Sequence, residues 1–126
     1  MRVQVYWNYH KKKWSVVALE GEDKGRVITH ADVVMVEDAK LAVQPRGNEK
    51  VREEGKKNVH AFVRGQWASQ DEVIYPKWLT QDEVKRGIKY NPYKYESFVL
   101  ADTDEPVYEA RSVALLGPRN VFAKLN

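Results

Sequence analysis

The chain has 126 residues, no cysteine and a formal net charge of +3, with a sequence pI near 9.0. This length suits one domain with a single hydrophobic core, and the absence of cysteine excludes disulfides, thiol nucleophiles and thiolate zinc sites. Apolar runs such as VVMV at 33–36 are too short to cross a membrane, and the first residues lack the pattern of a secretory signal. We therefore expect a cytoplasmic protein that does not enter membranes, and its small positive charge weakly favours anionic partners.

Residues 1–44 have the pattern of a first β unit. Arg2–Trp7 alternates, which predicts a half-buried strand with Val3, Val5 and Trp7 on one face. The polar stretch NYHKK then predicts a turn, because Asn8 can bond its own backbone two residues further on. Further strand-like segments, rich in β-branched residues, lie at 14–19, 26–31, 33–37 and 39–44.

Residues 45–87 have a mixed pattern. The stretch 46–58 has almost no apolar residue, which predicts a loop or a short solvated helix. A strand is expected at 59–65, with Phe62 and Arg64 on the face opposite Val63. Ser69–Glu72 and Thr80–Glu83 each fit the capping box, a hydroxyl followed three residues later by Glu. They predict two short helices, the first ending before Pro76 and the second near Gly87.

Residues 88–126 predict a second β unit. When Asn91 is aligned with Asn8 and Lys94 with Lys11, the order strand, Asn-turn, strand recurs, and 107–116 then falls on 27–36. We predict a single domain, 1–126, of the α+β class and mainly β. Two similar antiparallel units from an internal duplication, 1–44 and 88–126, would be joined by a short helical middle segment, 45–87. The alternative is that any two β meanders align loosely.

Basic residues gather at both Asn-turns (8–12 and 91–94) and in the 46–58 stretch, and tyrosines gather at the two turns. Lysine and arginine can neutralise phosphates there, Asn and His can add hydrogen bonds, and interleaved tyrosines suit stacking on unpaired bases. The alternative is a solvated surface, with Glu49, Glu53 and Glu54 pairing with neighbouring cations and tyrosines packing on a sheet. The predicted anion or nucleic-acid site comprises Lys11, Lys12, Lys13, Arg52, Lys56, Lys57, Asn58, His60, Tyr93 and Lys94.

Signals for catalysis and metal binding are thin. No two of the three histidines have ligand-like spacing, and we expect His30 to be a satisfied, half-buried strand residue. The chain has no P-loop, no dinucleotide-binding loop and no nucleophile elbow. We therefore expect no metal, no cofactor and no catalytic residue, although dispersed residues can still meet in space.

At KGRVITHA and KKNVHAFVRG the chain resembles a group of small, uncharacterised accessory proteins of tailed phages, and the resemblance extends from VYWN to NVFA. It implies a phage-encoded protein acting in an infected cell, and it transfers no site residues. Our leading hypothesis is a non-enzymatic protein that binds nucleic acid or a nucleotide and interferes with host machinery or defence. The alternatives are an inhibitor that contacts a host enzyme and a small hydrolase or nuclease. The pattern leaves the oligomeric state open, a homodimer included.

Overall fold

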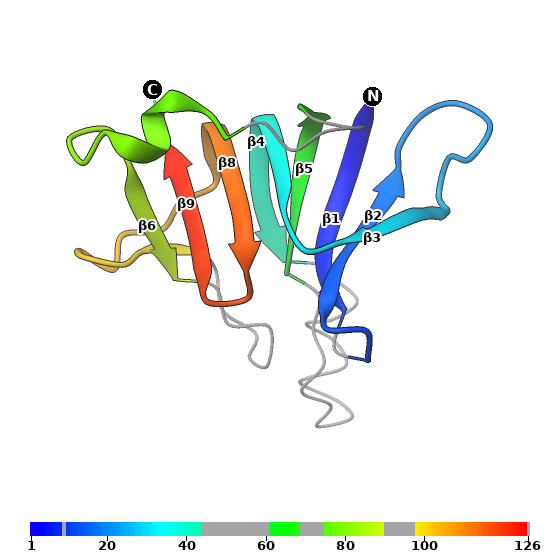
Figure 1. The fold of residues 1–126 in the computed structure, drawn as a ribbon, viewed down its shortest axis with the longest axis horizontal. Helices are drawn as coiled ribbons and strands as arrows, with labels where there is room; N and C mark the ends of the chain where they lie inside the picture. Colours follow the sequence, from blue (N-terminus) through cyan, green and yellow to red (C-terminus); the bar gives the residue numbers. More distant parts are fainter. Residues whose placement is uncertain (9, 44–60, 69–74, 90–97, 126) are drawn as a thin grey trace.

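The computed structural model describes residues 1–8, 10–43, 61–68, 75–89 and 98–125. In these ranges nine strands form one antiparallel sheet, in the order β3-β2-β1-β5-β4-β8-β9-β6-β7 (Figure 1). Outward from the β4–β8 pair, the order is β5-β1-β2-β3 on one side and β9-β6-β7 on the other. The strands are β1 Arg2–Asn8, β2 Lys13–Ala18, β3 Val27–Ala31, β4 Val34–Val43, β5 Ala61–Trp67, β6 Arg86–Lys89, β7 Val99–Leu100, β8 Glu109–Gly117 and β9 Asn120–Lys124.

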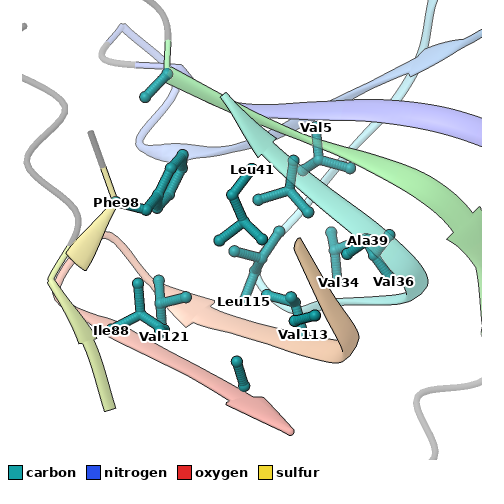
Figure 2. Close-up of a cluster of buried hydrophobic side chains, with 14 of the residues drawn as sticks. Val5, Val34, Val36, Ala39, Leu41, Ile88, Phe98, Val113, Leu115 and Val121 are labelled. Atoms are coloured by element: carbon teal, nitrogen blue, oxygen red, sulfur yellow. The ribbon is translucent and has the colours of Figure 1, made fainter. Parts of the chain in front are cut away.

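Strand β4 turns a corner in its middle, and this corner shapes the sheet. Asp38 has a left-handed backbone angle, φ 49°, and the register between β4 and β5 shifts between Glu37 and Lys40. An extra residue on one strand of a pair bends that strand and increases its twist. Figure 2 shows the β4 ribbon bending between Val36 and Ala39. The extra residue also resets the alternation, so that apolar residues on both sides of the corner, Val34, Val36, Ala39 and Leu41, are all buried.

The bent sheet encloses a single main core on its inner face. Figure 2 shows Phe98, which precedes β7, beside Leu41 of β4, with Leu115 and Ile88 in the same cluster. Side chains from both ends of the strand order therefore cover one core. At the β1–β2 end, the Trp7 and Trp14 rings pack edge to face, with centroids 5.1 Å apart.

A smaller cluster lies on the opposite face of the sheet. Met35 of β4 and Ala114 of β8 alternate with inward-facing neighbours, and they pack with Trp78. Trp78 belongs to a short 3-10 helix, η1 Lys77–Thr80, which Figure 1 shows beside β6 and β9. The cluster fastens η1 to the sheet because Trp78 is only 6% exposed.

The predicted α+β class, with a helical middle segment, is wrong for the part of the chain that the structure describes. Where a helix was expected from Thr80 to near Gly87, the chain has only η1 and then strand β6. The Thr80 hydroxyl donates to the Lys77 carbonyl oxygen at 2.8 Å, inside η1, and does not cap a following helix. Burial of Trp78 against the sheet overrides the local capping pattern. The other expected helix, from Ser69, lies outside the described residues.

The prediction of two β units joined by a middle segment is also wrong. Strand β5 comes from the middle segment and lies between β1 and β4, and β4 pairs with β8, so one sheet includes all parts. The aligned segments also differ in strand bounds and in register. Residues 27–36 contain strand β3 and the start of β4, whereas 109–117 form one strand. In the alignment Lys89 falls on Tyr6 and Val99 falls on Val16. Lys89 pairs with Val99, but Tyr6 pairs with Ser15 and not with Val16. Such a one-residue offset changes the register.

Candidate nucleic-acid interface

The turn between β1 and β2 presents the first predicted lysines to solvent. Asn8 Oδ1 accepts hydrogen bonds from the backbone N–H groups of His10 and Lys11, each at 3.1 Å. The expectation that Asn8 bonds its own local backbone is thus confirmed. The left-handed angle of the turn falls on Lys12, φ 53°. Lys11 and Lys12 are exposed on this turn, so they can contact a ligand without rearrangement.

A polar row links this turn to β3. Asn8 Nδ2 donates to Ser15 Oγ at 3.2 Å, and Ser15 Oγ lies 3.0 Å from His30 Nδ1. His30 is half-buried and hydrogen-bonded, as expected from the sequence. Ser15 is fully buried, so its hydroxyl holds strands together and does not reach a substrate. At the end of the row, Lys13 Nζ lies 3.5 Å from Asp32 Oδ1.

Replacing Asn8 by Ala should lower the free energy of unfolding by about 1–2 kcal/mol. The change removes the acceptor for two backbone N–H groups and one partner of the buried Ser15 hydroxyl. Urea denaturation followed by circular dichroism measures the decrease. Asn8→Asp is the matched control, because it keeps the turn acceptor and removes only the amide donor. Equal decreases in the two variants would contradict the structural role of the turn.

The outer face of β1 and β5 carries a second set of polar and aromatic groups, named here the β1–β5 face: Gln4, Tyr6, Phe62 and Arg64. Tyr6 pairs with Phe62 and Gln4 with Arg64, so all four side chains lie on the same side of the sheet. Arg64 Nη2 donates to Gln4 Oε1 at 2.6 Å, and its guanidinium carbon lies 5.1 Å from the centroid of the Phe62 ring. These contacts hold the guanidinium over an aromatic ring.

Two further cations border the β1–β5 face. Lys40 pairs with Arg64 from the β4 side, and Lys13 lies at the turn end of β2, paired with Asn8. Acidic groups are also near, since Glu109 of β8 pairs with Lys40 of β4 and Asp32 contacts Lys13. The face is therefore mildly basic, with one guanidinium–aromatic stack near its centre.

Only part of the predicted site lies in the described residues. Arg52, Lys56, Lys57, Asn58, His60, Tyr93 and Lys94 fall outside them, and Lys11, Lys12 and Lys13 are the members that the structure places. Val43 and Ala61, which flank residues 44–60, pair with each other, and Phe62 pairs with Tyr6. Sequence reasoning did not select Gln4, Arg64 or Lys40. Alternation placed Phe62 and Arg64 on one face, but only strand pairing brings β5 beside β1.

These features define a class, namely an antiparallel β protein with a mildly basic, partly aromatic sheet face. The described residues contain no helix long and apolar enough to span a membrane. The chain belongs to the family whose model is described as Mycobacterium phage L5 gene 82 protein, which matches residues 1–124. It is 43% identical over 121 residues to the gene 82 protein of Mycobacterium phage L5, covering 91% of this chain and 90% of that protein. No solved structure gives a significant match. The resemblance to uncharacterised phage proteins is thus confirmed.

Proposed function

We propose that this phage protein binds single-stranded nucleic acid through the β1–β5 face and the adjoining β1–β2 turn. The observation that carries the proposal is the half-buried Arg64 guanidinium, held over the buried Phe62 ring, with the half-buried Tyr6 as the next side chain along the same face. Unpaired bases stack on aromatic rings and on guanidinium planes, and this stacking tolerates any sequence.

The lysines supply the second half of the interaction. Lys11 and Lys12 are exposed, and Lys13 makes only a partly exposed ion pair with Asp32. Exposed pairs of this kind are worth at most about 1 kcal/mol, so a phosphate can replace the carboxylate at little cost. A strand of nucleic acid would have its phosphates at the turn and its bases along the β1–β5 face. Binding of this kind would allow the protein to interfere with host machinery or defence.

Replacing Lys11, Lys12 and Lys13 together by Gln should weaken binding to a fluorescein-labelled oligothymidine and flatten its salt dependence. The slope of log affinity against log salt should fall by about 0.7 for each phosphate that the variant no longer neutralises. Anisotropy titrations at several salt concentrations give both quantities. Stability should change by less than about 0.5 kcal/mol, because these are surface positions. Lys24→Gln, an exposed lysine in the turn between β2 and β3, is the matched control.

Arg64→Lys separates stacking from charge. It keeps the positive charge but removes the planar guanidinium, so affinity should fall while the salt slope stays unchanged. The proposal is rejected if the wild-type protein shows no salt-sensitive binding to single-stranded DNA or RNA at low ionic strength. Inhibition of a host enzyme by protein contact would then be the better explanation.

A further inference from the structure

A groove of about 440 Å³ lies between the segment 75–80 and strands β8 and β9, away from the β1–β5 face. Its apolar lining includes Leu79, Leu116 and Phe122, which pack against the cluster containing Trp78. Pro76 and Tyr75 complete the apolar part of the lining, and Tyr75 is 59% exposed. The groove is thus preformed on packed side chains, and a large aromatic residue at its edge remains open to solvent.

The charged residues that line the groove are both lysines, Lys77 and Lys85. The Lys85 ammonium lies 4.8 Å from the centroid of the Phe122 ring. Its carboxylate neighbour, Asp82, is 4.0 Å away and has a side chain that is 98% exposed. Such a pair is strongly screened by water, so Lys85 retains most of its attraction for another anion.

The lining favours a particular kind of ligand. The Thr80 hydroxyl already donates to the Lys77 carbonyl oxygen, so the groove offers little to recognise the polar edge of a base. Apolar side chains fit the walls formed by Leu79, Leu116 and Phe122, and carboxylates fit the lysines. We infer that this groove binds an acidic peptide segment of a partner protein, with an apolar side chain inserted between Tyr75 and Phe122 and flanking carboxylates on Lys77 and Lys85.

A labelled hexapeptide with a central Leu-Phe pair, flanked on each side by two glutamates, tests this inference. It should bind the wild-type protein and shift the backbone amide resonances of Lys77–Thr80 and Phe122. Replacing its glutamates by glutamine should weaken binding about tenfold. The Lys77→Glu and Lys85→Glu double variant should have the same effect, a tenfold loss that corresponds to about 1.4 kcal/mol. Tyr75→Ala should weaken binding of both peptides, because it removes part of the apolar wall.

The Lys24→Glu and Arg26→Glu double variant changes the net charge by the same amount at two exposed positions outside the groove, so it is the control for net charge and should leave peptide affinity within twofold. The inference is overturned if the acidic peptide does not bind, if it binds equally to the double variant, or if the shifted resonances lie elsewhere. It is also overturned if oligothymidine shifts the groove resonances more than the peptide does, since the groove would then belong to a nucleic-acid site. None of these outcomes depends on Lys11, Lys12, Lys13 or Arg64, so this test and that of the β1–β5 face can fail separately.

Discussion

Gly65→Ala should lower the free energy of unfolding by about 3 kcal/mol or more, or prevent folding. A β-carbon at this position would lie 2.5 Å from the Glu37 carbonyl oxygen and 3.0 Å from that of Asp38. Both contacts are to backbone at the corner of β4, where the strand makes its register shift, so they cannot be relieved by a side-chain rotation. Thermal and urea denaturation, followed by circular dichroism, give the decrease.

Gly117→Ala is the matched control for this prediction. Gly117 also lies in a strand, but the nearest atom to an added β-carbon would be the Asn120 β-carbon at 3.7 Å, an ordinary contact. The free energy of unfolding of the Gly117→Ala variant should differ from that of the wild-type protein by less than about 1 kcal/mol. If Gly65→Ala were as mild as Gly117→Ala, the close approach of β5 to the corner of β4 would be refuted.

Trp14→Ala should cost about 3–5 kcal/mol, the usual range for removing a buried tryptophan. Trp14 is 1% exposed and is the largest of the fully buried side chains in the described residues. Its removal opens a cavity beneath β2 and abolishes the edge-to-face packing with Trp7. Urea denaturation monitored by the fluorescence of the remaining tryptophans measures the effect.

A double-mutant cycle isolates the ring contact from the cavity. Trp7→Leu, Trp14→Leu and the double variant should give a coupling free energy of about 0.5–1.5 kcal/mol. Tyr108→Ala, at a side chain that is 65% exposed, should change stability by less than about 0.5 kcal/mol. A decrease for Trp14→Ala no larger than that for Tyr108→Ala would contradict the position of Trp14 in the core.

Local patterns predicted local structure well. The alternation in β1 correctly separated Val3, Val5 and Trp7 from Gln4 and Tyr6, and Asn8 bonds the backbone of its own turn as expected. Alternation also placed Phe62 and Arg64 on the face opposite Val63, which the pairing with β1 bears out. These features depend on the side-chain period of two and on hydrogen bonds between near neighbours.

Features set by distant partners could not be predicted. Glu37 and Asp38 separate two apolar runs, so the sequence suggested two strands, whereas the structure has one strand with a corner that Gly65 of β5 accommodates. The helix expected at Thr80 is also absent, because the chain there is held by the packing of Trp78 against distant strands. The same holds for the candidate site. The lysines of the β1–β2 turn could be selected from the sequence, but Gln4 and Arg64 are 60 residues apart and meet only through strand pairing.

The position of β5 in the sheet also constrains the order of folding during synthesis. Strand β1 lacks its second neighbour until β5, 61–67, has been made, and β4 must wait both for β5 and for β8, 109–117. A nascent chain that ends before residue 60 therefore has open hydrogen-bonding edges on β1 and β4, both rich in apolar residues. Pairings between segments so far apart close large loops, which slows folding. The β4–β8 pair thus forms late, after most of the chain has been synthesised, and β9, which joins β8 to β6, can be added only after that.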